Sequence, residues 1–298
     1  MSRFLSATAA DDDVRIGFIG IGAMGLPMAR NLHAAGFHVT AVDPSEKQRE
    51  LAAALGIATA SSVSALSEST LLIIMVASPS QLLGLLDESS LFGDAPRLRT
   101  AVVTSTVGPT AVRQFAERAA GYGVDVIDLA VTGGVAGAAN GTLTLLTGAP
   151  TPTIERVRSV LENLGRITVC GQNPGDGQAV KLVNNLLAAV NLAAVAEAIR
   201  FAKGMGLDPK NVVNLVRNGA AASWMLSERG PRMAVPREER DFDTFAAIFA
   251  KDTALIAEVA TEQRTSVPLL DVVKSQFAEV VTLGWASEDD SCIVDLPL

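Results

Sequence analysis

The chain has 298 residues, which is long enough for two domains of ordinary size. Hydrophobic residues make up 49% of it and charged residues 19%, proportions that place it among soluble globular proteins and exclude an intrinsically disordered chain. The formal net charge is −8 and no Lys- or Arg-rich block is present, which argues against a nucleic-acid partner.

The N-terminal residues, the apolar runs and the two cysteines indicate in which compartment the protein is expected. Residues 1–13 mix small and polar side chains and end in three aspartates, so we expect a disordered tail rather than a secretory signal. The apolar runs are short and none approaches the roughly 18 residues that span a bilayer, so we expect no membrane partner. Cys170 and Cys292 lie far apart, which predicts no disulfide framework and favours the cytoplasm.

Short aliphatic runs alternate with helical stretches in the first half of the chain. The predicted strands are residues 14–19, 39–42, 71–75, 101–104, 124–128, 142–146 and 167–169, and the predicted helices are residues 25–35, 46–55, 79–86, 110–120 and 152–164. This alternation is typical of a mostly parallel sheet with helices on both faces. We therefore predict an α/β domain over residues 14–175, a doubly wound sheet of the Rossmann type.

Strand patterns nearly vanish after Gly175. Residues 178–204, 208–217, 244–263 and 268–283 read as helices, so residues 176–298 are predicted to form an all-helical domain. The first of these helices is apolar on most of its faces, which predicts that it is buried, either between domains or between subunits.

The turn Gly20-Ile21-Gly22-Ala23-Met24-Gly25 joins a predicted strand to a predicted helix. A lone GxGxxG is weak because the chain has 25 glycines, but here the strand–turn–helix context is complete. We expect Gly20 to permit the tight turn, Gly22 to let the backbone approach a pyrophosphate, and Gly25 to pack the helix on the strand. The pattern predicts a dinucleotide site; a purely structural glycine-rich turn is the alternative.

Three neighbouring residues refine this prediction. Ala23 and Met24 stand where a helix N-terminus offers N–H groups and a positive dipole to phosphates. Asp43 ends the second predicted strand, about 20 residues after the turn, where a carboxylate accepts hydrogen bonds from the adenosine ribose and repels a 2′-phosphate. The pattern favours NAD over NADP, although Asp43-Pro44-Ser45 is also an ordinary helix-start sequence.

Histidine supplies no obvious catalytic group. The chain has only two, His33 and His38, and neither has a Cys, Asp or Glu at ligand spacing. We therefore predict no metal site and no Ser-His-Asp hydrolase. Lys181 is the remaining acid/base candidate, with Asn185 at i+4 on the same helix face. A lysine among Ala, Val and Leu either snorkels to solvent or serves in a cleft, and the residues alone leave both open.

Two polar loops follow predicted strands. Ser105-Thr106 comes after one strand, and Thr132-Gly133-Gly134 comes after the next. Loops at the carboxyl ends of parallel strands meet at the ligand crevice, where hydroxyl and glycine N–H groups suit a small carboxylate. Ordinary turn chemistry is the simpler explanation of both loops.

Residues 18–32, with the sequence FIGIGAMGLPMARNL, resemble the N-terminal motif of the β-hydroxyacid dehydrogenase family. This family includes 3-hydroxyisobutyrate dehydrogenase, tartronate semialdehyde reductase and the threonate-type dehydrogenases, and the resemblance extends over nearly the whole chain from Val14. Gly177, Lys181 and Asn185 are similar to the GxxxKxxxN helix start in which the family carries its catalytic lysine.

The resemblance implies further roles. Thr132-Gly133-Gly134 is similar to the family's substrate-binding Ser-Gly-Gly loop, with Thr in the place of Ser, and Ser105-Thr106 is similar to the Ser-Thr turn near the nicotinamide, with Ser105 assigned to the substrate and Thr106 to the cofactor. Lys251, in the pair Lys251-Asp252, corresponds to a lysine on the cofactor side. Asp128-Leu129-Ala130 departs from the family's Asp-Ala-Pro, which puts the shape of the substrate loop in doubt.

The activity implied is reversible oxidation of a small 3-hydroxy acid by NAD, with Lys181 as general acid/base and Asn185 orienting it. The substrate would be 3-hydroxyisobutyrate or a three- to four-carbon sugar acid. A reductase of the tartronate semialdehyde type and a non-catalytic dinucleotide sensor are the alternatives. The resemblance also implies a homodimer or homotetramer.

Overall fold

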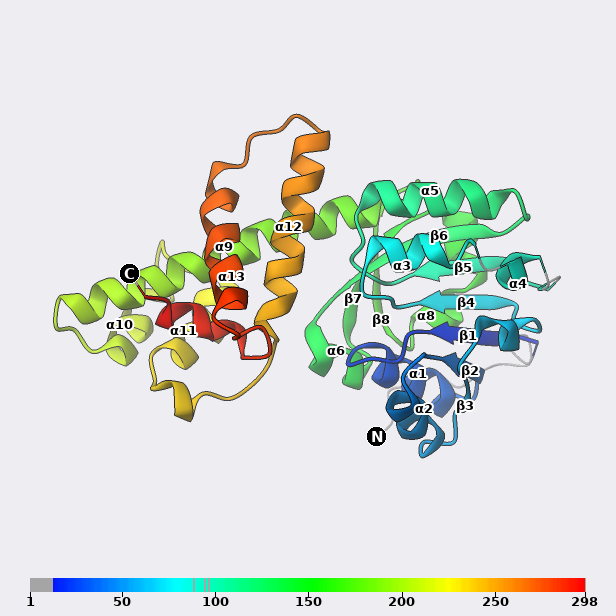
Figure 1. The fold of residues 1–298 in the computed structure, drawn as a ribbon, viewed down its shortest axis with the longest axis horizontal. Helices are drawn as coiled ribbons and strands as arrows, with labels where there is room; N and C mark the ends of the chain where they lie inside the picture. The colour runs from blue at the N-terminus through cyan, green and yellow to red at the C-terminus, as the bar shows by residue number, and fades with distance from the viewer. Residues whose placement is uncertain (1–12, 88, 94, 96, 298) are drawn as a thin grey trace. The chain divides into compact units, whose positions relative to one another are not determined.

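The computed structural model describes residues 13–87, 89–93, 95 and 97–297 (Figure 1). The chain divides into two compact units, Met1–Lys181 and Leu182–Leu298, whereas the sequence placed the division after residue 175. Except for Asp13, the tail predicted to be disordered lies outside the described residues.

The first unit contains an eight-stranded sheet with the order β3-β2-β1-β4-β5-β6-β7-β8. The strands are β1 (Arg15–Ile19), β2 (His38–Val42), β3 (Ala58–Ala60), β4 (Leu71–Ile74), β5 (Thr100–Val103), β6 (Asp125–Thr132), β7 (Leu143–Gly148) and β8 (Gly165–Gly171). Every neighbouring pair is parallel except β6 and β7, which are antiparallel. The predicted mostly parallel, Rossmann-type sheet is confirmed. The sequence missed β3, which has three residues and no aliphatic run.

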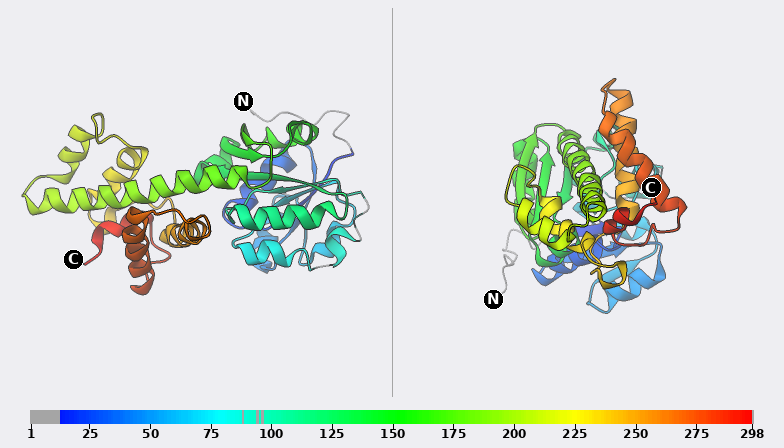
Figure 2. Two further views of the ribbon diagram at one scale, coloured as in Figure 1. Left: turned by 90° about the horizontal axis from the view of Figure 1, so that it is seen from above. Right: turned by 90° about the vertical axis from the view of Figure 1, so that its left-hand side faces the viewer.

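Helices cover both faces of this sheet (Figures 1 and 2). One layer contains α1 (Gly25–Ala34), α2 (Glu46–Ala53), α6 (Gly134–Asn140), α7 (Thr151–Arg156) and α8 (Arg158–Leu161), and the other contains η1 (Val63–Leu66), α3 (Pro79–Gly84), α4 (Ser89–Phe92) and α5 (Pro109–Ala120). Successive strand residues point to opposite faces, so Phe18 is buried in one hydrophobic core and Ile19 in the other.

The strand register defines one row of residues across the sheet. Ile19, Ile74, Val103 and Asp128 are paired in sequence across β1, β4, β5 and β6. Strand β6 then continues to Thr132 against β7, which runs back so that its Gly148 lies opposite Asp128. Because β8 is parallel to β7 and Gly171 pairs with Gly148, the chain returns to the carboxyl edge of the parallel strands. The next helix, α9 (Asp176–Gly204), starts from that edge.

The second unit is helical, as predicted. It contains the rest of α9, then α10 (Pro209–Val216), α11 (Trp224–Met233), η2 (Arg237–Glu239), α12 (Ala246–Glu262), α13 (Pro268–Thr282) and η3 (Asp290–Asp295). The adjacent helices α12 and α13 (Figure 1) are joined by stacked rings of Phe249 and Phe277, whose centroids lie 5.2 Å apart. Leu192 and Ala196 of α9 belong to the same core.

Helix α9 corrects one expectation. By length and composition it is apolar enough to cross a membrane, so the statement that no segment approaches that length is wrong. Of its most apolar 18-residue window, 39% is buried within the protein. One such helix is weak evidence for a membrane span, because the core helix of a soluble protein has the same composition.

Candidate active site

The glycine turn after β1 has the geometry of a dinucleotide-binding turn. Gly20 has φ +87°, and a Cβ at this position would lie 2.1 Å from the carbonyl oxygen of Met75. A Cβ at Gly25 would lie 2.0 Å from the carbonyl oxygen of Gly20. Only glycine fits at either position, so the strand and α1 approach as closely as the sequence pattern indicated.

Gly22 differs from these two glycines. No heavy atom of the described residues lies within 4 Å of the Cβ that Gly22 lacks, and the residue is exposed. Packing within the described protein therefore gives no reason for glycine here, whereas close approach of a ligand to the backbone does. Ala23 is also exposed and Met24 is half-buried at the start of α1, whose N-terminal dipole favours an anion. These residues fit the pyrophosphate of a dinucleotide.

Asp43 holds two parts of the site together. Its Oδ2 accepts a 2.9 Å hydrogen bond from the backbone N–H of Ile21 in the glycine turn, and its Oδ1 accepts one of 2.8 Å from Ser45. Arg49 donates hydrogen bonds of 2.8 Å to the carbonyl oxygens of Asp43 and Pro44. An ionised carboxyl group has about four lone-pair positions, so Asp43 retains capacity for ribose hydroxyls.

The hydroxyl of Ser105 is occupied by backbone groups. It accepts a 2.6 Å hydrogen bond from the N–H of Val76, lies 3.4 Å from the carbonyl oxygen of Ile74, and is buried with the rest of the side chain. The side chain of Ser105 thus connects the loop after β5, where it lies, to the loop after β4. Its neighbour Thr106 is half-buried.

A buried network joins these strands to the start of α9. Gln178 donates hydrogen bonds from Nε2 to the carbonyl oxygen of Ser105 at 2.9 Å and to Oδ1 of Asp128 at 3.0 Å. Its Oε1 accepts hydrogen bonds of 3.0 Å from the N–H groups of Val107 and Gly108. The network fixes the first turn of α9 against the ends of β5 and β6.

Asp128 is the only carboxylate in this network. Its Oδ2 accepts hydrogen bonds from the N–H groups of Gln178 at 2.8 Å and Gly175 at 3.0 Å. Burial raises the pKa of Asp128 to about 6, because the cost of desolvating the charge exceeds the opposing effect of its hydrogen bonds from Gln178 and Gly175.

The loop Thr132-Gly133-Gly134 leads into α6. Thr132 is half-buried at the end of β6, and the two glycines are exposed with φ of +128° and +63°. The side-chain amide of Asn31 on α1 donates a 2.8 Å hydrogen bond to the carbonyl oxygen of Ala138 on α6. The helix that follows the glycine turn therefore also holds the helix that follows this loop.

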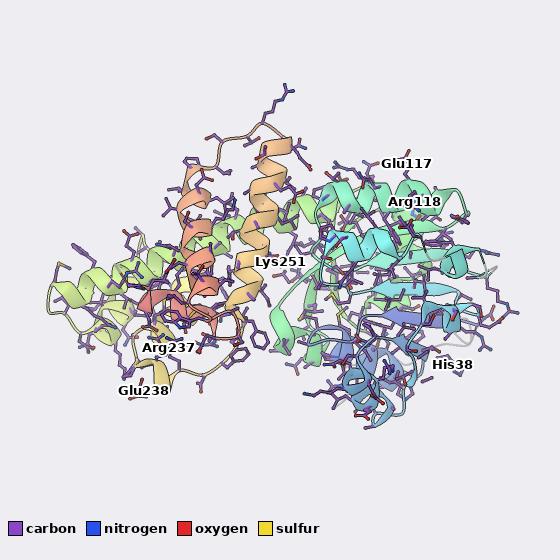
Figure 3. The ribbon with its side chains drawn as sticks, viewed as in Figure 1. His38, Glu117, Arg118, Arg237, Glu238 and Lys251 are labelled. Carbon is purple, nitrogen blue, oxygen red and sulfur yellow. The ribbon has the colours of Figure 1, made fainter. Side chains whose placement is uncertain are left out.

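Lys181 is half-buried in the second turn of α9, one helical turn after Gln178. In the second unit, Nδ2 of Asn185 donates a 2.7 Å hydrogen bond to Oδ2 of Asp252, whose other carboxylate oxygen lies 3.0 Å from Nζ of Lys251. Figure 3 shows Lys251 on α12. The predicted residues Asn185 and Lys251 are thus connected through Asp252.

The structure brings most of the predicted residues of the first unit to one edge. The glycine turn and Asp43 directly follow β1 and β2 at the row of residues defined above, and Ser105-Thr106 follow the end of β5 after one intervening residue. Sequence reasoning missed the contributions of Asp128 and Gln178, although the Gly-rich break before α9 pointed to this segment. His38, labelled in Figure 3, lies at the opposite, N-terminal end of β2.

Models of two protein families match the chain. Residues 15–171 match the NAD binding domain of 6-phosphogluconate dehydrogenase. Residues 175–296 match a domain described as NAD-binding of NADP-dependent 3-hydroxyisobutyrate dehydrogenase.

Similar proteins agree with these matches. The chain is 33% identical to 2-hydroxy-3-oxopropionate reductase of Escherichia coli (strain K12) over 290 residues, which cover 94% of the chain and 96% of the relative. The chain belongs to the β-hydroxyacid dehydrogenase family. It is therefore an NAD(P)-dependent hydroxyacid dehydrogenase of the 3-hydroxyisobutyrate dehydrogenase type.

Two further similar proteins have other names. An NAD-dependent L-serine dehydrogenase of Pseudomonas aeruginosa is 31% identical, covering 95% of the chain and 97% of the relative. The structure of Mycobacterium tuberculosis 3-hydroxyisobutyrate dehydrogenase with L-serine superimposes with a TM-score of 0.85 at 28% identity, covering 95% and 98%. L-serine appears in the descriptions of both proteins, whereas the Escherichia coli relative is named for 2-hydroxy-3-oxopropionate.

Proposed function

We propose that the protein transfers a hydride between NAD and a small 3-hydroxy acid of three or four carbons, with Lys181 as the general acid/base. The observation that carries this proposal is the anchoring of Lys181. One helical turn before it, the fully buried amide of Gln178 is bound to the loop after β5, at the carboxyl edge where a parallel sheet binds dinucleotides. A surface lysine needs no such buried support.

The proposed chemistry divides between cofactor and protein. When bound, the nicotinamide accepts the hydride from the carbon that bears the hydroxyl group, or returns it. Lys181 takes the hydroxyl proton in oxidation and gives it back in reduction, so it must be neutral when oxidation begins. Asn185, at i+4 on the same helix, orients the lysine or the substrate hydroxyl.

The loop Thr132-Gly133-Gly134 is proposed to bind the substrate carboxylate. Its two glycines are exposed and carry no side chains of their own beside their backbone N–H groups, and Thr132 supplies a hydroxyl. Ser105 acts indirectly, because its own hydroxyl is bonded to Val76. Thr106 and Lys251 are proposed on the cofactor side, as the family resemblance implies.

NAD is the proposed cofactor rather than NADP. The support is Asp43, whose carboxylate is held by Ile21 and Ser45 at the end of β2, where it would repel a 2′-phosphate.

Replacement of the lysine tests the mechanism. Lys181→Ala should lower kcat at least about 1,000-fold, within the range that general acid–base catalysis supplies, while the affinity for NAD measured by calorimetry stays near that of the parent. Lys203→Ala, an exposed lysine on the same helix, is the matched control and should retain activity. Turnover by Lys181→Ala close to that of the control would remove the proposed mechanism.

A screen identifies the substrate and separates the alternatives. NAD reduction is followed with 3-hydroxyisobutyrate, glycerate, L-serine and threonate, and NADH oxidation with tartronate semialdehyde. Glycerate with the highest kcat/KM among the hydroxy acids, together with reduction of tartronate semialdehyde, would favour an aldehyde-acid reductase of the kind that the name of the Escherichia coli relative describes. NAD binding without turnover of any of these compounds would favour the remaining alternative, a non-catalytic dinucleotide sensor.

We further propose that the protein is a cytoplasmic homodimer or homotetramer. Large apolar side chains on α9 and α10 are exposed, among them Leu187, Phe201 and Leu215, the last with 80% of its surface accessible. Such exposure is typical of surfaces that associate. Both cysteines, Cys170 and Cys292, are free thiols, which suits a reducing compartment. Light scattering at micromolar concentration should give a mass of two or four chains, and a monomer would contradict the oligomer.

A further inference from the structure

The side chain of Gln178 uses its full hydrogen-bonding capacity inside the protein. Its two N–H bonds go to Ser105 and Asp128, and its carbonyl oxygen accepts from Val107 and Gly108. None of its surface is accessible to solvent. A buried amide with four partners has one orientation only.

The partners of Gln178 dictate that orientation. Two N–H groups face Oε1 and two oxygens face Nε2, so turning the amide over would oppose donors to donors and acceptors to acceptors. The site therefore requires an acceptor at Oδ1 of Asp128. The other oxygen of Asp128 receives the N–H groups of Gly175 and Gln178, so this one carboxylate binds both the backbone and the side chain of the helix start.

The start of α9 packs closely against the sheet at Gly177. A Cβ on Gly177 would lie 2.3 Å from the carbonyl oxygen of Leu146 and 3.0 Å from Oδ2 of Asp128. The first turn of α9 thus lies directly on the sheet, held by Asp128 from β6 and by the loop that follows β5.

We propose that Asp128 and Gln178 are positioning residues that together set the location of Lys181 relative to the loop of Ser105 and Thr106. This inference rests on the proposed role of Lys181. A change in the Asp128–Gln178 contact displaces the helix turn that carries the lysine, and a displacement of about 1 Å can lower catalysis about 100-fold.

Other ionisable groups surround this contact. Asp176 on the first turn of α9 accepts a hydrogen bond from the N–H of Asn173, and Cys170 on β8 experiences the charges of Asp128 and Asp176. Arg113 on α5 borders Gly175, where a Cβ would lie 2.8 Å from its Nε. These groups remain constant in the variants below, so differences among the variants report on position 178.

Two substitutions at position 178 and one control test the inference in the 298-residue chain. Gln178→Leu removes all four side-chain hydrogen bonds at similar volume. Gln178→Glu keeps the acceptor for Val107 and Gly108 but loses both N–H donors and brings a second carboxyl group against Asp128. One shared proton can replace the bond to Asp128, while the carbonyl oxygen of Ser105 loses its donor. Asn163→Leu removes another buried amide of the same unit, one that donates to the carbonyl oxygen of Ser159.

Gln178→Leu should lower kcat about 100-fold with little change in NAD affinity. The ratio of the kcat of Gln178→Glu to the kcat of the parent should be highest at low pH and fall about tenfold per pH unit once the shared proton dissociates. Asn163→Leu should lower the melting temperature without changing the pH profile. Hydrogen exchange of the cofactor-free protein should rise in residues 105–108 and 175–181 in Gln178→Leu, and in residues 175–181 in Gln178→Glu.

Each outcome has one meaning. If both Gln178 variants keep the parent kcat and pH profile, or change only as Asn163→Leu does, the positioning role is wrong. Turnover by Lys181→Ala instead overturns the proposed function, whatever the Gln178 variants show. An inactive Lys181→Ala together with an unaffected Gln178→Leu leaves the acid/base role standing and removes only the positioning role.

Discussion

The side-chain amide of Asn185 donates a 2.7 Å hydrogen bond to the buried carboxylate of Asp252, which lies next to Lys251 in the chain. Asn185 also accepts a 2.9 Å hydrogen bond from Asn184, so both ends of its amide are held. Hydrogen bonds thereby join Asn184, Asn185 and Asp252 of the second unit into one group.

Removal of the Asp252 carboxylate should release Asn185. Asp252→Ala leaves a buried N–H without its acceptor, which costs about 1–3 kcal/mol of stability, and it should lower kcat because Asn185 is no longer oriented. Asp252→Asn retains an acceptor oxygen and is the matched control. Equal kcat values for the two variants, measured beside their melting temperatures, would show that the hydrogen bond does not serve catalysis.

Asp43 should set the preference between the two nicotinamide cofactors. Asp43→Asn removes the charge that repels a 2′-phosphate, while Arg49 remains beside it on the carbonyl oxygens of Asp43 and Pro44. The ratio of kcat/KM with NAD to kcat/KM with NADP should fall about 10- to 100-fold, which corresponds to about 1.4–2.8 kcal/mol. An unchanged ratio would contradict the NAD assignment.

Asn31 should affect the substrate more than the cofactor. Asn31→Leu removes the hydrogen bond to Ala138 and loosens α6, which follows the loop proposed to bind the carboxylate. We expect KM for the hydroxy acid to rise about tenfold, the effect of about 1.4 kcal/mol, with the dissociation constant of NAD little changed. The reverse pattern would show that Asn31 stabilises the glycine turn instead.

The raised pKa of Asp128 predicts a pH dependence of stability. The carboxyl group has a pKa of about 6 in the folded protein against 3.8 for the free side chain, so the folded state binds the proton more tightly. Its contribution to stability is complete below pH 3.8 and is lost as the pH rises through about 6. Because Asp128→Asn cannot titrate, its destabilisation relative to the parent should be larger at pH 4.5 than at pH 8, by on the order of 2 kcal/mol. Urea unfolding at the two pH values measures this, and equal destabilisation would refute it.

The sequence was most informative where chemistry is local. The strand–turn–helix pattern predicted the tight approach at Gly20 and Gly25 because the steric demand of that turn falls on a few consecutive residues. The helical second half was predicted from apolar spacing alone. Helix α6 was missed because Gly134–Asn140 contains only glycine, alanine, one valine and one asparagine, and so has little amphipathic pattern. Helix α11 was missed because it contains Pro231.

Long-range pairing could not be predicted. Asp128 and Gln178 are 50 residues apart and meet only because β7 reverses the direction of the chain. Asn185 and Asp252 are 67 residues apart. The role of Ser105 toward the substrate stays a prediction, and the sequence did not reveal that its hydroxyl accepts a hydrogen bond from Val76, 29 residues away. Such partners depend on how strands are ordered in the sheet, which spacing along one chain does not reveal.

Gly148 pairs with both Asp128 and Gly171. The lengths of β7 and β8 therefore determine where the chain arrives at the start of α9. Deleting two residues from either strand would keep its side chains on their faces but would move its end by about 7 Å, carrying the start of the long helix away from its anchor. Related genes should therefore tolerate insertions and deletions in the turns around Gly123 or Gly56, which face solvent, and resist them between Leu143 and Gly171.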